Sequence, residues 1–212
     1  MEVATTTRND RRRARTREAL IEAAVRVMAT KGVDATSLRD ITTAADLGLG
    51  TFYNHFKSKD DLVDVIANRT VERLGQALDR LTANMDDPAE VFAISFRHSL
   101  RSVDRDPVWG WFVVRVQRAE EVLTKHLGHR ALRDVRRGVR HGRFRSVHLR
   151  PFGIAIQGIL VGAMRAKLEN HAGTRDDHEL TAYTLELLGI EADEARAIAR
   201  RPLPAVPLVA VD

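Results

Sequence analysis

The sequence predicts an all-α protein of about nine helices. Apolar residues recur at helical spacing along the chain, and no run of four or more residues alternates convincingly between apolar and polar. Neither Asn-Gly nor Asp-Gly, the dipeptides that favour tight hairpin turns, occurs in the sequence. Capping residues, glycines and prolines separate the helical segments, as expected for successive helices.

Composition indicates a globular protein and excludes several classes. The chain has 212 residues, 34 Lys+Arg against 29 Asp+Glu, and no cysteine. The lack of cysteine excludes disulfide scaffolds, cysteine-bound zinc, iron–sulfur clusters and thiol catalysis. The uncharged stretch from Pro151 to Met164 is shorter than the roughly 18–20 residues that span a bilayer. The N-terminus is polar and Arg-rich without an apolar signal segment, so we expect a cytoplasmic protein.

The first third of the chain predicts three helices and the start of a fourth. Lys31-Gly32 is a typical helix end. Ser37 with Asp40 near the capping-box position begins a short helix, and Ser58 caps a longer one with acidic residues in its first turn. The apolar positions of these helices are Leu20, Ala24, Val27 and Met28; Leu38, Ile41, Ala44 and Ala45; Phe52 and Phe56; and Leu62, Val65, Ile66, Leu74, Leu78 and Leu81.

The remainder of the chain predicts further helices and an extended tail. Asp87-Pro88 and Asp106-Pro107 each mark a helix start. Pro151 opens an apolar helix to about Leu168, and Asp176 or Asp177 caps the next helix, which stops at Gly189. A last short helix runs from Asp193 to Arg200. The expected domains are a flexible basic arm (1–14), an N-terminal helical domain (15–62), a larger helical domain (63–201) and a proline-rich tail (202–212).

The segment Thr36 to Leu62 carries the functional signal. It reads TSLRDITTAADLGLGTFYNHFKSKDDL, two short helices joined by a tight turn, which predicts a helix-turn-helix. The second helix presents Thr51, Tyr53, Asn54 and His55, which can bond base edges or phosphates. Gly48 and Gly50 permit close approach to DNA, and Lys57 and Lys59 supply charge for the phosphate backbone.

This segment resembles the tetracycline-repressor (TetR) family of bacterial transcription regulators. The resemblance covers about residues 15–65 and includes Asp40-Ile41, Ala44-Ala45 and Gly50-Thr51-Phe52-Tyr53-x-His55-Phe56-x-Ser58-Lys59. It implies that the first three helices bind DNA and that a fourth leads to a divergent ligand-binding and dimerisation domain. It also implies phosphate contacts for Thr36, Ser37 and Lys59, and a recognition helix carrying Gly50, Thr51, Tyr53, Asn54 and His55.

The turn departs from the family pattern. The family usually has Gly-Val-Ser-Lys where this chain has Asp46-Leu47-Gly48-Leu49. Asp46 falls where a left-handed backbone is expected, which aspartate tolerates better than most residues. Leu49 could meet a thymine methyl group instead of a phosphate.

Two clusters of arginines have alternative interpretations. The run from Arg8 to Arg17 is either a solvated tail or an addition to DNA affinity beside the recognition motif. Arg133, Arg136, Arg137 and Arg140 share a helical face that continues to Arg143 and Arg145. This basic face is either solvated or binds an anionic effector.

The second domain is expected to bind an effector and to form a homodimer. An apolar or amphipathic small molecule would occupy a pocket lined by aromatic and apolar side chains, although these residues could equally form core. The candidates are Phe92, Phe96, Trp109, Phe112, Val113 and Met164. Small and apolar residues at helical spacing predict the dimer interface: Ile154, Gly158, Gly162, Ala166, Leu180, Tyr183 and Leu187.

These features predict a ligand-responsive repressor that binds a pseudo-palindromic DNA operator as a homodimer. We expect no catalytic residues, metal or cofactor, since the scattered histidines supply only the pair His126 and His129 without a third ligand. Two alternatives remain open at this level. A closed C-terminal core would favour an architectural DNA-binding protein, and a buried polar constellation would favour a helical enzyme.

Overall fold

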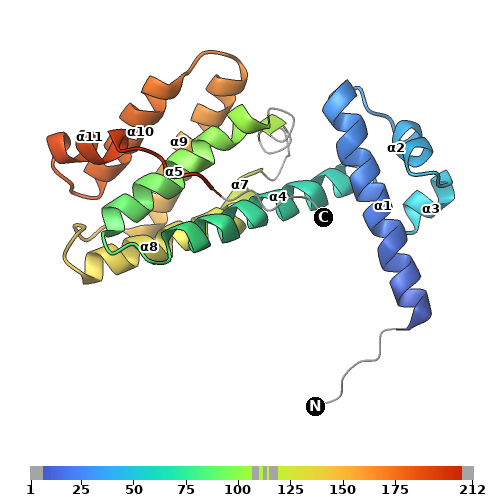
Figure 1. Cartoon of the computed structure of the whole chain (residues 1–212), viewed down its shortest axis with the longest axis horizontal. Coiled ribbons are helices and arrows are strands. Elements are labelled where there is room, and N and C mark those ends of the chain that lie inside the picture. Colours follow the sequence, from blue (N-terminus) through green and yellow to red (C-terminus); the bar gives the residue numbers. More distant parts are fainter. Residues whose placement is uncertain (1–6, 107–109, 112–113, 115–118, 207–212) are drawn as a thin grey trace. The chain divides into compact units, whose positions relative to one another are not determined.

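The computed structural model describes residues 7–106, 110–111, 114 and 119–206, and all regular secondary structure in this part of the chain is helical. The chain divides into two compact units, residues 1–66 and 67–212 (Figure 1). The division falls within one continuous helix, α4 (Lys59–Thr82). The all-α architecture expected from helical spacing is therefore confirmed for the described residues.

The N-terminal unit consists of α1 (Arg8–Lys31), α2 (Leu38–Ala44), α3 (Leu49–Tyr53) and the start of α4. Local sequence explains each boundary. Gly32 ends α1 at φ 81°, Ser37 and Asp40 form the predicted capping box of α2, and the Ser58 hydroxyl accepts from the Asp61 amide at the start of α4. The core contains Leu20, Ala24, Met28, Ile41, Phe52, Phe56 and Leu62, all at most 2% exposed.

The basic N-terminal segment differs from the expectation of a flexible arm. α1 begins at Arg8, and Thr7 forms a capping box with Asp10. Residues 8–14 are therefore helical, because the reciprocal hydrogen bonds of this cap satisfy the free amides of the first turn.

The C-terminal unit continues α4 and adds α5 (Pro88–Arg105), α7 (Ala119–Leu123), a π-helical turn η1 (Thr124–Gly128) and α8 (His129–Arg140). It is completed by α9 (Leu149–Leu168), α10 (Thr174–Leu187) and α11 (Ala192–Arg200). α5 lies at its centre and packs against α8, α9, α10 and α11. Figure 1 shows these helices gathered around α5. Most residues of α5 are buried.

The start of α10 corrects a predicted cap. α10 begins at Thr174, so Asp176 lies in its first turn and accepts a hydrogen bond from the Gly173 amide at 2.7 Å. Asp177 is not a cap but a buried carboxylate, with Lys167 Nζ 2.9 Å from its Oδ1. Sequence spacing alone does not distinguish a capping aspartate from one that pairs with a distant lysine.

Two buried side chains of α5 hold the segment after α11. Arg97 donates to the Arg201 carbonyl at 2.6 Å, and His98 Nε2 lies 2.9 Å from the Pro204 carbonyl. His98 Nδ1 accepts from Arg105, so the Nε2–H group is the donor to Pro204. Residues 201–206 have no helix or strand, and the rest of the predicted tail lies outside the described residues.

Candidate DNA-binding surface and ligand cavity

The turn between α2 and α3 positions the recognition helix. Asp46 has φ 53°, which confirms the left-handed backbone expected at this position. Gly48 then caps α3, and its extended backbone directs the chain into the helix. Phe52 anchors α3 in the core, while Leu49 and Tyr53 are 48% and 55% exposed. The sequence therefore buries one face of α3 and presents the other to solvent.

Most predicted DNA contacts lie at the surface. Ser37, Gly48, Leu49, Gly50, Tyr53, Asn54 and Lys57 are exposed, and Thr51, His55 and Lys59 are partly exposed. Thr36 is buried, and its hydroxyl donates to the Gly32 carbonyl at 2.7 Å. Lys59 Nζ donates to the carbonyls of Val33 and Thr36 at 3.1 and 3.0 Å. The Thr36 and Lys59 side chains thus support the turn between α1 and α2.

The C-terminal unit contains a cavity of about 520 Å³ between α4, α5, α8 and α9. Its wall is predominantly apolar and includes residues from each of these helices. The apolar members of the lining are Leu78, Phe92, Phe96, Leu123, Leu127, Leu132, Leu149, Phe152, Ile154, Ile156 and Leu160. A cavity of this size and character is typical of a small-molecule site.

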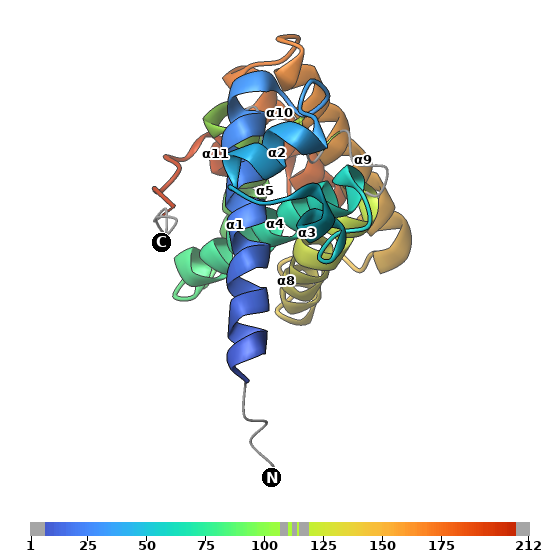
Figure 2. The same cartoon turned by 90° about the vertical axis from the view of Figure 1, so that its right-hand side faces the viewer.

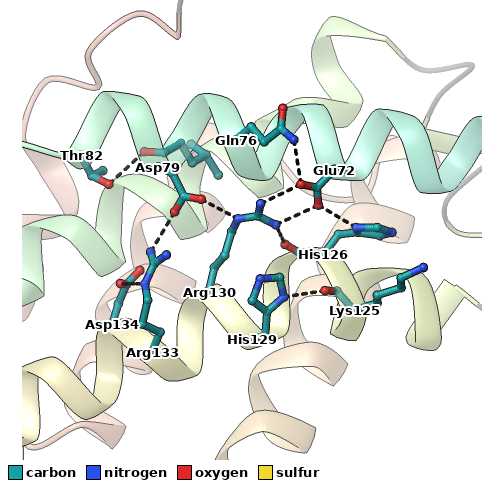
Figure 3. Close-up of polar contacts among 11 residues, drawn as sticks. Glu72, Gln76, Asp79, Thr82, Lys125, His126, His129, Arg130, Arg133 and Asp134 are labelled. Atoms are coloured by element: carbon teal, nitrogen blue, oxygen red, sulfur yellow. Dashed lines mark hydrogen bonds and ion pairs between the residues drawn. The ribbon is translucent and has the colours of Figure 1, made fainter. Parts of the chain in front are cut away.

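The cavity also has a polar edge, formed where α8 meets α4 (Figure 3). Asp79, Arg130 and Asp134 all contribute to the lining. Arg130 lies between two carboxylates of α4, with Nε 2.7 Å from Asp79 and Nη2 2.9 Å from Glu72. Figure 3 shows its guanidinium group lying across α4 between these carboxylates. This edge supplies both donors and acceptors beside an apolar chamber.

Neighbouring groups extend the polar edge into a network. Arg133 bridges Asp79 and Asp134, at 2.8 and 2.9 Å. His126 Nδ1 lies 2.8 Å from Glu72, and because a carboxylate only accepts, this nitrogen is the donor. The network therefore joins η1 and α8 to two successive turns of α4.

Ionisation within this network follows from its contacts. Hydrogen bonds from Arg130 and then His126 lower the pKa of Glu72 to about 2. Burial opposes ionisation of Asp79, yet hydrogen bonds from Arg130 and Arg133 hold its pKa below the usual value. Burial raises the pKa of Asp134 despite its contact with Arg133. Asp134 is thus the carboxylate of the cavity whose charge is least stabilised by the protein.

The predicted ligand residues are only partly brought together. Phe92 and Phe96 line the cavity with their rings stacked at 6.1 Å, whereas Met164 is fully buried and is not part of the lining. Trp109, Phe112 and Val113 lie outside the described residues. Sequence reasoning missed Asp79, Arg130 and Asp134. The sequence signal that could have identified this edge is the seven-residue spacing of Glu72 and Asp79, which places both carboxylates on one face of α4.

The basic face of α8 is partly neutralised. Arg133 pairs with Asp79 and Asp134, and Arg143 pairs with Asp87 and Glu194. Arg136 contributes to the cavity lining and is exposed. These ion pairs favour a structural role for Arg133 and Arg143 over recognition of an anionic effector.

None of the residues predicted to form a dimer interface is buried within the protomer. Ile154 and Tyr183 are 65% and 53% exposed, and Leu187 is 39% exposed. Gly158 and Gly162 are exposed, and a Cβ atom on either would meet nothing within 4 Å. Ala166 and Leu180 are half-buried at the same helices. A second chain could therefore approach α9 closely along these glycines.

Two structural absences apply to the described residues. Within the ranges given above, no group of three or more His, Cys, Asp or Glu side chains is placed to hold a metal ion. In the same part of the chain, no helix combines the length and apolarity needed to cross a bilayer.

The architecture defines a class of protein: a helix-turn-helix DNA-binding unit followed by a helical unit with a ligand-sized cavity. Comparison with protein families agrees with this class. Residues 20–66 match the family described as "Bacterial regulatory proteins, tetR family", and residues 87–201 match "Tetracyclin repressor-like, C-terminal domain". The chain belongs to the TetR family of transcriptional regulators.

Individual relatives match different lengths of the chain. The crystal structure of RolR in complex with resorcinol is 39% identical, with a TM-score of 0.83, and the match covers 92% of this chain and 98% of RolR. The repressor KstR2 of Mycolicibacterium smegmatis is 32% identical over 84 residues, which are 38% of this chain and 41% of KstR2. The nicotine-responsive repressor HdnoR of Paenarthrobacter nicotinovorans is 33% identical over 38% of this chain and 40% of HdnoR. The chain thus matches about two-fifths of the length of these curated repressors.

Proposed function

We propose that this protein is a homodimeric repressor that is released from a pseudo-palindromic DNA operator by a small-molecule effector. The observation that carries the proposal is the cavity with one polar edge in the C-terminal unit, joined to a helix-turn-helix by the continuous helix α4. An open cavity distinguishes this function from that of an architectural DNA-binding protein. The family contains regulators, and we propose that the chain regulates transcription in the cytoplasm without catalysing a reaction.

The effector that fits the cavity is a small hydroxylated aromatic molecule. The stacked rings of Phe92 and Phe96 offer an apolar surface for an aromatic ring. At the polar edge, Asp134 can accept a hydrogen bond from a ligand hydroxyl, while Arg130 can donate one to the hydroxyl oxygen. RolR, which shares 39% identity over nearly its whole length, binds resorcinol, a molecule of this class.

DNA recognition is assigned to the exposed face of α3. Leu49, Gly50, Tyr53 and Asn54 would enter the major groove, and Ser37 and Lys57 would hold phosphates on either side. A two-fold dimer would place two such helices on half-sites about one helical turn, roughly 34 Å, apart or at a related spacing. The exposed surface of α9 and α10 is the proposed dimer interface.

Coupling between effector and operator would pass through α4. Glu72 and Asp79 tie this helix to α8 at the edge of the cavity, and its first residues belong to the DNA-binding unit. An effector that rearranges the ion pairs of Arg130 with Glu72 and Asp79 would change how α4 is held against α8. A coupling free energy of about 1–3 kcal/mol would reduce operator affinity by roughly 5- to 150-fold.

The proposal is tested by combining calorimetry with operator binding. Operator DNA is first selected from random duplexes with the dimeric protein. Resorcinol, catechol and phenol are then titrated, with benzene as the control that lacks a hydroxyl group. We expect saturable binding of a hydroxylated aromatic and a parallel loss of operator affinity. A protein that selects no DNA sequence, or whose DNA affinity no hydroxylated aromatic changes, would contradict the proposal.

A further inference from the structure

The first turns of α1 form a basic helical extension. No residue from Arg8 to Arg17 is buried, whereas Leu20, Ala24 and Met28 later in the helix are fully buried. In Figures 1 and 2 these N-terminal turns project beyond α2 and α3. The extension is helical and therefore presents its arginines in fixed directions.

The arginines of this extension divide into two groups by helical position. Arg13 and Arg17 are spaced by four and continue the stripe of Leu20, Ala24 and Met28, which faces the rest of the unit. The other four fall on the opposite side of the helix and are far from this stripe: Arg8, Arg11, Arg12 and Arg15. The two groups therefore have similar charge but different surroundings.

Arg13 and Arg17 lie beside the end of the recognition helix. The guanidinium carbon of Arg17 is 4.9 Å from the centre of the Phe56 ring, where it stacks by a cation–π contact. Burial and then the nearby charges of Arg13 and Arg17 lower the pKa of His55. Positive charges thus converge on the segment that follows α3.

Among the described residues, neither guanidinium group forms an ion pair with a carboxylate, although hydrogen bonds from Thr7 and then the nearby charge of Arg13 lower the pKa of Asp10. In the part of the chain that the structure describes, neither Arg13 nor Arg17 forms a hydrogen bond or ion pair with an acidic side chain, while Arg26 further along α1 does pair with Glu22. Arg13 is exposed and Arg17 is held in place by Phe56. Such a pair has free donors suited to a phosphate group.

We infer that Arg13 and Arg17 of α1, together with His55 in the segment that follows α3, bind a backbone phosphate of operator DNA beside the recognition helix. The inference rests on the proposed function and adds a contact outside the helix-turn-helix itself. Arg17 is pre-oriented by its stacking on Phe56, so less side-chain entropy is lost on binding. The four arginines of the opposite face contribute only long-range attraction.

The test compares two charge-matched double variants. Arg13→Gln/Arg17→Gln removes the proposed phosphate contact, and Arg12→Gln/Arg15→Gln removes the same charge from the opposite face. We expect the first variant to lose at least about tenfold in operator affinity and to flatten the slope of log K against log salt by up to about 2. The second variant should lose clearly less. The single variant Arg13→Gln, at an exposed position, removes one of the two charges and leaves the contact between Arg17 and Phe56 intact.

An uncharged analogue of a single backbone phosphate identifies which phosphate Arg13 and Arg17 contact. Single methylphosphonates are placed in turn along the selected operator, and affinities are measured for the wild type and both double variants. We expect a methylphosphonate that weakens wild-type binding but has no further effect on Arg13→Gln/Arg17→Gln, while Arg12→Gln/Arg15→Gln behaves as the wild type does.

Equal losses by the two double variants, or no methylphosphonate whose effect depends on Arg13 and Arg17, would overturn the inference while leaving the proposed function intact. A wild-type protein that selects no operator would overturn both.

Discussion

Gly75 leaves the space in which the Arg130 guanidinium lies. A Cβ atom on Gly75 would be 2.7 Å from Nη1 and 2.9 Å from Cζ of Arg130, and 3.0 Å from the His126 carbonyl oxygen. Gly75 is placed on α4 between Glu72 and Asp79, the two carboxylates that Arg130 joins. A glycine within a helix costs about 1 kcal/mol of stability relative to alanine. At position 75 this cost is offset because the missing side chain leaves room for the Arg130 guanidinium group.

Substitution of Gly75 by alanine is expected to weaken both the network and effector binding. The new methyl group displaces the guanidinium end of Arg130 from Glu72, and the loss of these charge-assisted hydrogen bonds outweighs the gain of about 1 kcal/mol in helix propensity. Chemical unfolding and ligand calorimetry measure the two effects. Gly153→Ala is the control for the unfolding measurement alone, because its Cβ would meet only Leu132 at an ordinary 3.8 Å, and both residues line the cavity. A Gly75→Ala protein more stable than the wild type would show that Arg130 relaxes without loss.

Asp134→Asn is expected to lower affinity for a hydroxylated aromatic effector by about tenfold, or roughly 1.4 kcal/mol. The carboxylate is a stronger acceptor than an amide, and burial already raises the pKa of Asp134. Calorimetry of the effector measures the loss. Arg136→Gln, at an exposed position of the same lining, is the matched control and should bind nearly as the wild type does. Equal effects of the two substitutions would argue against a specific contact with Asp134.

His98 is expected to make stability depend on pH. Burial, and next the charge of Arg105, lower the pKa of His98 to about 4. In the unfolded chain the pKa of histidine is about 6.5, so the unfolded state takes up the proton first as the pH falls. The free energy of unfolding should therefore decrease on acidification below about pH 6.5, by roughly 3 kcal/mol in total once the pH is below 4.

Urea unfolding between about pH 5 and 6.5 measures this effect where most carboxylates remain ionised. The pKa values of His55 and His178 are also lowered, so a variant is needed to separate the contribution of His98. The control is His98→Gln, whose amide can still donate to the Pro204 carbonyl but does not titrate. We expect this variant to have a flatter pH dependence in that range. The same slope in both proteins would assign the pH dependence to other groups.

Gly162→Leu is expected to yield a folded monomer. Its Cβ has open space within the protomer, so the leucine fits there, but at a two-fold interface it acts twice and overpacking costs about 1–3 kcal/mol per site. Sedimentation at low protein concentration measures the assembly. Ala197→Leu, at an exposed position of α11 outside the predicted interface residues, should remain dimeric. A Gly162→Leu protein that is dimeric with full operator affinity would place the interface elsewhere.

Tyr53→Ala is expected to weaken operator binding by about 1–3 kcal/mol. Tyr53 is 55% exposed, and its ring lies edge-on to Phe52, which holds it at the surface of α3. Tyr53→Phe retains this packing and tests the hydroxyl alone. Gel-shift titration measures affinity, and a thermal melt verifies folding. An unchanged affinity for Tyr53→Ala would remove it from the recognition surface.

Much of the N-terminal unit is determined locally and could be read from the sequence. The Ser37–Asp40 capping box, the glycine end of α1 and the left-handed Asp46 each depend on residues within a few positions. Their hydrogen bonds and backbone preferences are the same wherever such segments occur, so the helix-turn-helix followed from its motif.

The polar edge of the cavity and the roles of several charged residues were decided by tertiary packing. Arg130 and Glu72 are 58 positions apart, and Asp177 meets Lys167 across two helices instead of capping α10. Lys59 bonds loop carbonyls although its motif predicts a phosphate contact. The sequence determined which segments become helices, because caps and apolar spacing act over a few residues. The tertiary structure selected the partners of each charge, because burial makes an unpaired charge costly and the available partner depends on which helices pack together.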